Sequence, residues 1–323
     1  MNKVKQTLAI LAGALGVMAG PALADYPERE ITFIVPYNPG GSTDPISRAF
    51  SAALSRDLGI SVIVENRPGG SATIGTGTVL SSAPDGYTIG LGSNSSLAFQ
   101  PIVMSNLDWQ SPDDYDVLAK LVDVPAILYV GRDSPYQTID DFIADVDARP
   151  GEIRASVSGL RTAPDLVVQY YNSLTGRELR TVPFSGGGGE ALTAVLSGRV
   201  EASVGYGPSI RAYVDSGDLR PLGVFSREGT EDFPDAVPMA TEEHDASLPA
   251  AYYVIAPNGL PEDVRATLIE AVNNAIDSEE FRTFARSNSY EVDILNSEES
   301  EEELVRYRDI FEQILAYIEE NEV

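Results

Sequence analysis

The segment Ile31–Arg48 constrains the fold of this chain more than any other stretch. An apolar run, Ile31–Val35, passes through two prolines and two glycines into a helical pattern. Asp44 is expected to cap that helix, and Pro45 to lie in its first turn, where a missing N–H costs nothing. The glycines allow a close approach of the backbone to a ligand, and the first turn leaves N–H groups unpaired. This corner predicts an α/β connection that can bind an anion.

The same alternation of short apolar runs and helical patterns continues along the chain. Further strands are expected at Ser61–Val64, Tyr87–Leu91, Ala126–Val130, Ile153–Val157, Leu179–Phe184, Val200–Val204, Leu222–Phe225 and Tyr252–Ala256. Helices are expected at Asp44–Leu58, from about Ala72, and at Thr138–Val146, Asp165–Leu174, Glu190–Leu196, Pro261–Ile276 and Ser297–Glu320. This succession predicts mostly parallel sheets, with ligand-binding loops at the carboxyl ends of their strands. The last helix is expected to dock on the protein, although a coiled coil or a partner-binding helix is the alternative.

The first 24 residues have the pattern of a secretory signal peptide. Lys3 and Lys5 precede the short apolar run Leu8–Ala19, and small residues at 22–24 predict cleavage before Asp25. An uncleaved membrane anchor is the alternative, but the run is shorter than the ~20 residues that span a bilayer. We therefore expect an exported, soluble protein in the periplasm.

The chain is strongly acidic, with 49 Asp and Glu against 22 Lys and Arg and a formal charge of −27. The predicted leader contains Lys3 and Lys5 but no Asp or Glu, so its removal would change the formal charge to −29. Lys120 would then be the single lysine of the chain. Such a charge excludes general affinity for nucleic acid or anionic membranes. It is typical of a solvated acidic surface and favours a salt-adapted source.

Several kinds of chemistry are excluded by what the sequence lacks. There is no cysteine, so disulfides are absent, and His244 is the one histidine, so no zinc-ligand cluster can form. No nucleophile elbow or metalloprotease motif occurs, and the glycine run at Ser185–Glu190 lacks the lysine of a P-loop. We expect no cofactor, no metal and no enzymatic activity.

Four loops share one design, in which a strand end leads through small residues into a helix start. They are Asn38–Asp44, Arg67–Thr73, Gly159–Asp165 and Ser185–Glu190. If two lie in each of two lobes, their N–H groups and hydroxyls would hold the carboxylates of a small ligand between them. Each loop can equally be an ordinary α/β connection, Asp44 a helix cap and Asn94 a polar loop residue. Arg161, the cation in these loops, can bind a carboxylate or form a surface ion pair.

A family resemblance rests on blocks spread over the chain. These blocks are Tyr26–Pro27, Ile31–Pro36, Pro39–Asp44, Val64–Gly70, Ala83–Thr88, Val182–Phe184, Leu196–Val200 and Ala256–Pro261. In them the chain resembles the substrate-binding receptors of tripartite tricarboxylate transporters, also called Bug receptors.

The resemblance implies a fold like that of type II periplasmic binding proteins, with two α/β lobes around a ligand cleft. Residues 25–128 and 249–323 would form the first lobe, and residues 129–248 the second. A small organic acid would be bound by lobe closure and delivered to the large and small membrane subunits of a transporter. The receptor itself would act as a monomer.

The resemblance and the loops together give a set of candidate ligand-binding residues. The first lobe would contribute Tyr37, Gly41, Ser42, Thr43, Asp44, Ser71, Thr73, Ser93 and Asn94. The second lobe would contribute Arg161, Thr162, Asp165, Ser185, Gly186 and Gly205. The second lobe departs from the usual family pattern at Ala163–Leu166 and at Phe184–Gly187, where a cation is lost. Arg161 is expected to compensate, and the identity of the acid stays open.

Two other functions remain as alternatives. A receptor of the same fold can serve a membrane sensor kinase instead of a transporter. A periplasmic hydrolase is the other alternative, and it would need a nucleophile such as Ser42 or Ser185.

Overall fold

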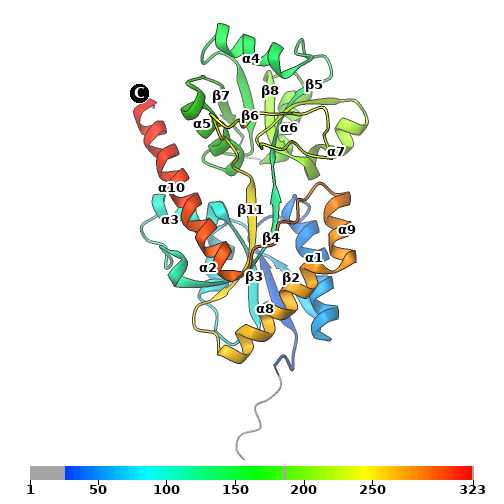
Figure 1. Ribbon diagram of the computed structural model, residues 1–323, viewed down its shortest axis with the longest axis vertical. Helices are drawn as coiled ribbons and strands as arrows, with labels where there is room; N and C mark the ends of the chain where they lie inside the picture. Colours follow the sequence, from blue (N-terminus) through cyan, green and yellow to red (C-terminus); the bar gives the residue numbers. More distant parts are fainter. Residues whose placement is uncertain (1–25, 185–186, 322–323) are drawn as a thin grey trace, which may run out of the picture.

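Two β-sheets, one above the other, organise the chain in the computed structural model (Figure 1), which describes residues 26–184 and 187–321. The predicted leader and the candidate residues Ser185 and Gly186 lie outside the described residues. The first sheet has the strand order β2-β1-β3-β11-β4, and the second has the order β10-β9-β5-β8-β6-β7. We call the parts built on these sheets the first lobe and the second lobe.

The bounds of most strands follow the predicted apolar runs, and β4 and β10 have no predicted counterpart. The first sheet consists of β1 (Ile31–Val35), β2 (Val62–Asn66), β3 (Thr88–Ser93), β4 (Tyr115–Val124) and β11 (Ala250–Pro257). The second consists of β5 (Ala126–Gly131), β6 (Arg154–Val157), β7 (Arg180–Pro183), β8 (Ala202–Tyr206), β9 (Leu219–Val224) and β10 (Val237–Pro238).

The helices cover the sheets and fill the connections between strands. In the first lobe they are α1 (Thr43–Leu58), η1 (Gly70–Ala72), α2 (Thr73–Leu80), η2 (Ser95–Phe99), α3 (Gln100–Val103), η3 (Pro112–Asp114), α8 (Glu262–Asp277) and α9 (Glu279–Ser287). In the second lobe they are α4 (Ile139–Ala148), α5 (Ala163–Thr175), α6 (Gly188–Leu196) and α7 (Gly207–Asp215). The last helix, α10 (Ser297–Asn321), follows the first lobe in the chain.

Parallel pairing prevails among the strands that alternate with helices. β1 pairs in parallel with β2 and β3, and β6 with β7 and β8. The antiparallel pairs all involve β5 or β11. Each of these two strands enters its sheet from the other lobe, so it runs against its neighbours. The predicted α/β architecture with mostly parallel sheets is confirmed.

The chain crosses between the lobes at a narrow junction (Figure 1). β4 ends at Val124 and β5 begins at Ala126 in the other sheet, and β11 returns the chain to the first sheet after Pro249. The segment 288–295 runs beside β4, because Asp123 and Glu291 exchange two backbone hydrogen bonds of 2.8 and 2.9 Å. The predicted lobe boundaries at residues 128 and 248 stay a prediction.

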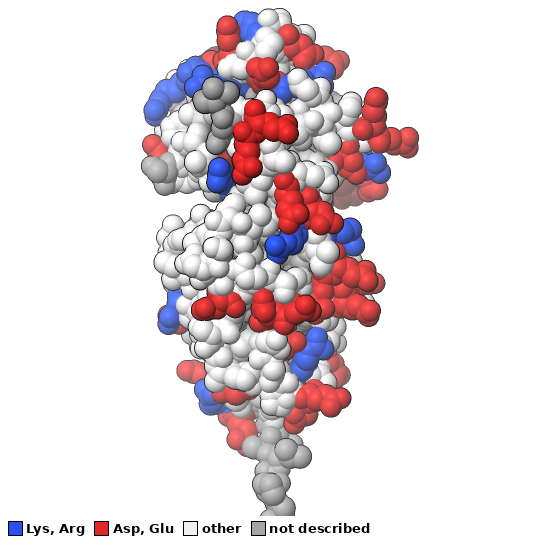
Figure 2. Space-filling model, turned by 90° about the vertical axis from the view of Figure 1, so that its left-hand side faces the viewer, with Lys and Arg blue, Asp and Glu red and all other residues white. Residues whose placement is uncertain are grey.

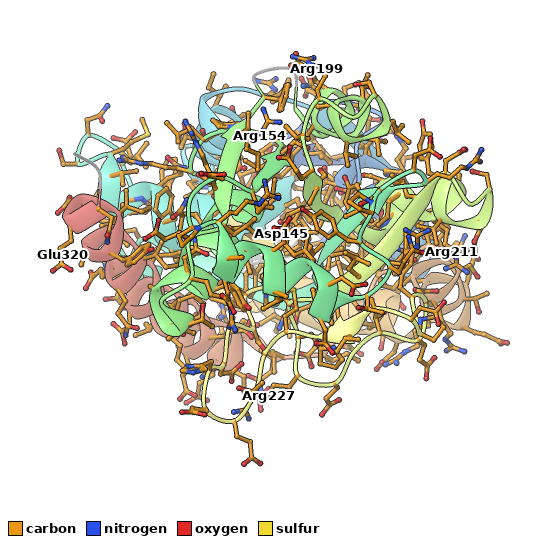
Figure 3. All side chains as sticks on the ribbon, turned by 90° about the horizontal axis from the view of Figure 1, so that it is seen from above. Asp145, Arg154, Arg199, Arg211, Arg227 and Glu320 are labelled. Carbon is orange, nitrogen blue, oxygen red and sulfur yellow. The ribbon has the colours of Figure 1, made fainter. Side chains whose placement is uncertain are left out.

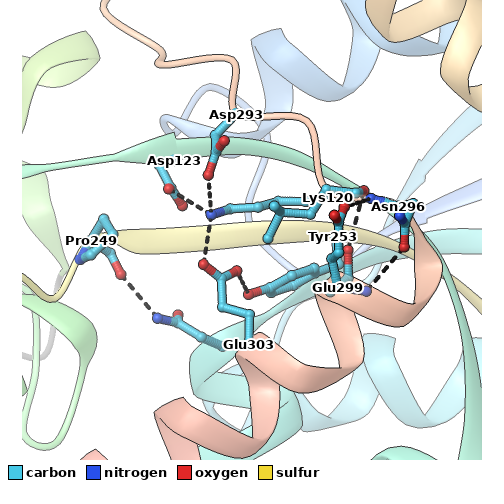
Figure 4. Close-up of polar contacts among 11 residues, drawn as sticks. Lys120, Asp123, Pro249, Tyr253, Asp293, Asn296, Glu299 and Glu303 are labelled. Atoms are coloured by element: carbon cyan, nitrogen blue, oxygen red, sulfur yellow. Dashed lines mark hydrogen bonds and ion pairs between the residues drawn. The ribbon is translucent and has the colours of Figure 1, made fainter.

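Lys120 on β4 is buried at this junction among three carboxylates (Figure 4). Its Nζ donates to Asp123 at 2.7 Å and to Asp293 and Glu303 at 2.9 Å, while Glu303 also accepts a hydrogen bond from the Tyr253 hydroxyl at 2.5 Å. Burial by itself would lower the pKa of Lys120, but the neighbouring carboxylates hold this pKa above the ordinary value. Burial raises the pKa of Asp123 to about 7 despite the ammonium, since three acids share one cation. The oxygens of these acids are close enough to hold a metal ion, but the lysine ammonium is the cation they surround.

The helix α10 extends from the first lobe along the second and ends beside α5 (Figure 1). Its apolar stripe joins one buried cluster with side chains of β4 and of α5. The buried residues of the stripe are Leu304, Tyr307, Phe311, Ile314 and Ile318. The helix therefore docks on its own chain, as expected, and it contacts both lobes.

Strands β4 and β10 and helices α3, α7 and α9 were not predicted from the sequence. In β4 the polar residues Lys120 and Asp123 interrupt an otherwise apolar run, and their burial depends on partners that are distant in the sequence. α9 has only nine residues, and its buried positions Phe281 and Ala285 span a single turn, which is too short a stretch to establish a helical period on its own.

Acidic side chains dominate the face drawn in Figure 2, with basic ones scattered among them. Among the described residues, no helix combines the length and apolar character needed to cross a bilayer.

Candidate functional site

The loop after β1 places Tyr37 against the end of β3. The Tyr37 hydroxyl donates to Ser93 Oγ at 2.9 Å, and its ring packs edge-on against Tyr252, with ring centroids 6.3 Å apart. Ser93 is buried and bonds further to Ser96. Two candidate residues that are 56 positions apart in the sequence are therefore in direct contact.

Asp44 is occupied by contacts within the first lobe. The helix α1 begins at Thr43 with Ser42 before it, so the prediction of Asp44 as its cap is wrong, and Asp44 is its second residue. Its carboxylate accepts from Asn66 Nδ2 at 2.9 Å, Arg48 Nε at 3.0 Å and the Gly40 N–H at 3.3 Å. Burial alone would raise its pKa, but these bonds hold the pKa of Asp44 below the ordinary value. The carboxylate ties the β1 loop to the end of β2.

Gly41, Ser42 and Thr43 lie at the start of α1. Gly41 is exposed, and a Cβ there would meet only the Asn38 carbonyl, at 3.6 Å, so nothing crowds this backbone. The Ser42 carbonyl accepts a hydrogen bond from the Tyr290 hydroxyl. Thr43 is buried.

The loop before α2 approaches the β1 loop closely. Ser71 is exposed and, like Ala72, has a positive φ, at 53° and 75°. Thr73 Oγ1 donates to the Gly70 carbonyl at 2.7 Å. A Cβ on Gly75 would lie 2.6 Å from Pro36 and from the Arg67 carbonyl, so only glycine lets α2 pack here. The two first-lobe loops predicted to act together are adjacent.

Asn94 lies at the junction of the lobes. It is buried, its Oδ1 accepts from the Ser95 N–H, and its Nδ2 donates to the Pro249 carbonyl at 2.9 Å. These bonds hold the end of β3 against the chain that returns to the first lobe, and the role of Asn94 in ligand binding stays a prediction.

The second-lobe loop Gly159–Asp165 is fixed by Asp165. Arg161 has a φ of 55°, and its N–H donates to Asp165 Oδ2 at 2.6 Å. Thr162 Oγ1 donates to the Gly159 carbonyl at 2.8 Å. Asp165 is buried, and burial raises its pKa. The carboxylate therefore holds the loop in shape from inside the lobe.

Gly205 lies next to the end of β8 and is followed by Tyr206. A Cβ on Gly205 would lie 3.1 Å from the Tyr129 hydroxyl, so a side chain would crowd the second-lobe core. Both Tyr206 and Ala163 of the second lobe pack against the first-lobe core. The carboxyl end of β8 and the start of α5 thus meet the first lobe.

Three tyrosines near these loops escaped the sequence analysis: Tyr206, Tyr252 and Tyr290. Tyr252 and Tyr290 belong to the first-lobe core, and Tyr206 packs against this core as Tyr37 does. Burial raises the pKa of each of the four, so all are neutral hydroxyl donors. The only signal in the sequence is that Tyr206 directly follows Gly205 and that Tyr252 lies in a strand that joins the lobes.

Labelled arginines of the second lobe are spread around its periphery (Figure 3). Arg154 pairs with Glu201 at 2.8 Å, Arg227 pairs with Asp245 at 3.0 Å, and Arg211 pairs with Asp232. These cations neutralise nearby acids. They do not form a basic patch.

Two hollows of the surface lie away from the candidate residues. One lies between η3 and α10 and is lined by acids such as Glu298, Glu301 and Asp113. The other lies between α1 and α9, beside Arg48, Phe281 and Phe284. No candidate residue lines either hollow.

Two α/β lobes joined at a narrow junction, with loops of both lobes meeting there, define a periplasmic-binding-protein-like solute-binding protein. The family model described as "Tripartite tricarboxylate transporter family receptor" (TctC) matches residues 46–314. The chain belongs to this family, as the resemblance implied. The family consists of periplasmic solute-binding receptors and not of enzymes.

Relatives and solved structures agree with this assignment. The protein BugT of Bordetella pertussis is 30% identical over 280 residues, which cover 86% of each chain. The structure of R. palustris Rpa4515 with adipate is 25% identical with a TM-score of 0.79, covering 91% of this chain and 98% of that one. MatC from Rhodopseudomonas palustris with bound malate shares the fold at 24% identity and a TM-score of 0.73, covering 88% and 100%.

Proposed function

We propose that this protein is an extracytoplasmic receptor that captures a small carboxylate by closure of its two lobes. The observation that carries this proposal is family membership combined with loops of neutral donors that meet at the lobe junction. Similar proteins were solved with adipate and with malate, which are both dicarboxylates. We propose a di- or tricarboxylate, or a related organic acid, as the ligand.

The negative net charge of the chain favours a ligand site built from neutral hydrogen-bond donors. The chain as a whole repels anions, so a bound acid needs favourable potential locally. The N–H groups at the starts of α1, α2 and α5 and the nearby hydroxyls can supply it without a buried cation. We propose that Gly41, Ser42, Thr43, Ser71, Thr73 and Ser93 contact the ligand from the first lobe. From the second lobe we propose Arg161, Thr162 and Gly205, with Ser185 and Gly186, which lie outside the described residues.

The delivery of the ligand is the further part of this proposal. We propose that the loaded receptor, a periplasmic monomer after removal of residues 1–24, docks on the two membrane subunits of a tripartite transporter. A sensor kinase of the membrane is the competing recipient. Genes for transporter subunits beside the receptor gene would favour the first, and a gene for a sensor kinase would favour the second. Adaptation to high salt also stays a prediction.

A thermal-shift screen tests the proposed ligand class. Adipate, malate, succinate and citrate are added to the purified protein, with adipamide as an uncharged control. At 100 times its Kd a ligand adds about 2.7 kcal/mol to the free energy of unfolding. We expect at least one acid to raise the Tm by several degrees and adipamide to leave it unchanged. A rise with adipamide equal to that with adipate would contradict recognition of carboxylates.

A further inference from the structure

Tyr206 belongs to the second lobe but lies at the junction with the first. It is the last residue of β8, and it pairs with Ala126, the first residue of β5 after the crossing. Its ring packs against the core of the first lobe as well as that of the second. Tyr206 therefore bridges the two lobes at the base of the candidate site.

The hydroxyl of Tyr206 is buried and has no hydrogen-bond partner among the described residues. Native proteins pair almost all buried polar groups, because a buried donor that gives up water without a new partner costs free energy. An unpaired donor beside ligand-binding loops indicates a hydrogen bond to a molecule that is not part of the chain.

Tyr206 packs against the same core as two tyrosines of the first lobe. Tyr252 belongs to that core, Tyr37 packs against it, and the two rings contact each other edge-on. Tyr37 donates its hydroxyl proton to Ser93 at 2.9 Å. The Tyr206 hydroxyl, in contrast, has no partner among the described residues.

We propose that Tyr206 is a ligand-binding residue whose hydroxyl donates a hydrogen bond to a carboxylate of the bound acid at the junction end of the site. This inference rests on the proposed function and assigns the chemistry of one subsite. Burial raises the pKa of Tyr206, so the hydroxyl keeps its proton and attracts an anion without adding a charge. In this subsite the carboxylate would be bound by the hydroxyl groups of tyrosine and serine and not by a positively charged side chain.

The position of Tyr206 couples this bond to closure. Tyr206 comes from the second lobe, whereas Tyr37, Ser42, Ser93 and Tyr252 come from the first. A carboxylate that contacts both groups would link the two lobes. This link would drive closure to the extent that it is stronger in the closed state than in the open state.

The test compares Tyr206→Phe with the wild-type protein by isothermal titration calorimetry with adipate and malate. Tyr136→Phe is the matched control, because the Tyr136 hydroxyl donates to Asp145 within the second lobe at 2.6 Å. We expect Tyr206→Phe to weaken binding about 10-fold to 100-fold, the loss typical of one hydrogen bond to a charged group. Tyr136→Phe should bind as the wild type does.

The ligand-free stability of the same variants separates a binding role from a structural one. Removal of an unpaired buried hydroxyl should leave the Tm of the free protein unchanged or slightly raised. Equal affinity of Tyr206→Phe and the wild type for both acids would overturn the assignment of Tyr206 alone, as would a lowered Tm of the free variant. Failure of the wild type to bind either acid would overturn the proposed function together with this inference.

Discussion

The side chain of Asp165 fixes the backbone conformation at Arg161, four residues earlier in the chain. The Asp165 carboxylate accepts the Arg161 N–H from a buried position and thereby stabilises a φ of 55° that L-residues seldom adopt. Burial raises the pKa of Asp165, and the charge of Arg161 opposes that rise. Both residues were predicted from the sequence to lie in the ligand site. Asp165 shapes the loop, and the binding roles of both residues stay predictions.

We expect Arg161→Ala to weaken binding of a dicarboxylate more than binding of a monocarboxylate. A guanidinium contributes most where a second carboxylate needs a charged partner. Calorimetry with adipate and with hexanoate measures the two losses. Arg149→Ala removes the same charge from the exposed pair with Asp145, so it controls for the net charge of the protein. Equal losses for the two acids would mean that Arg161 acts on the structure of the loop.

At the scale of elements, the lysine–carboxylate cluster joins three segments that are distant in the sequence. Lys120 and Asp123 come from β4, Asp293 from the segment beside it, and Glu303 from α10. Tyr253 of β11 adds a second strand of the junction through Glu303. The cluster therefore holds both junction strands against the helix that contacts both lobes.

We expect Lys120→Met to lower the free energy of unfolding by about 3–5 kcal/mol, because it leaves buried carboxylates without their cation. Urea unfolding followed by circular dichroism measures this loss. Arg132→Met, which breaks the exposed pair with Asp218, is the control and should cost no more than about 1 kcal/mol. A loss for Lys120→Met as small as that of the control would show that the cluster does not stabilise the junction.

At the scale of the whole molecule, two lobes share a narrow junction and a helix that touches both. The second lobe reaches the first core through Ala163 and Tyr206, and α10 packs on α5. Motion of one lobe against the other must therefore rearrange contacts at these places. A ligand held between the lobes favours the state in which the contacts are made.

Small-angle X-ray scattering tests this motion in solution. We expect a smaller radius of gyration when the acid with the largest thermal shift is added, because bound ligand shifts the population toward the closed state. Adipamide at the same concentration should leave the scattering curve unchanged. An unchanged curve with an acid that calorimetry shows to be bound would contradict capture by lobe closure.

Much of the fold was accessible from the sequence because local patterns determine it. The strand–glycine–helix corner at Ile31–Arg48 folds as predicted into β1 and α1, and Gly59 ends that helix in the left-handed conformation. Strand β4 was not predicted because a lysine within a strand is usually exposed. The burial of Lys120 depends on its three acidic partners, two of which are distant in the sequence. The tyrosines of the junction were missed because nothing local links positions 37, 206, 252 and 290.

The sequence by itself determined the alternation of strands and helices, the acidic surface and the membership in a receptor family. These properties depend on residues that are near one another in the chain or on composition alone. Only the tertiary structure decided that Asp44 and Asn94 have hydrogen-bond partners within the protein and that Tyr206 of the second lobe packs against the first-lobe core. Hydrogen-bond partners and burial depend on contacts between distant segments, and those contacts exist only once both sheets have formed.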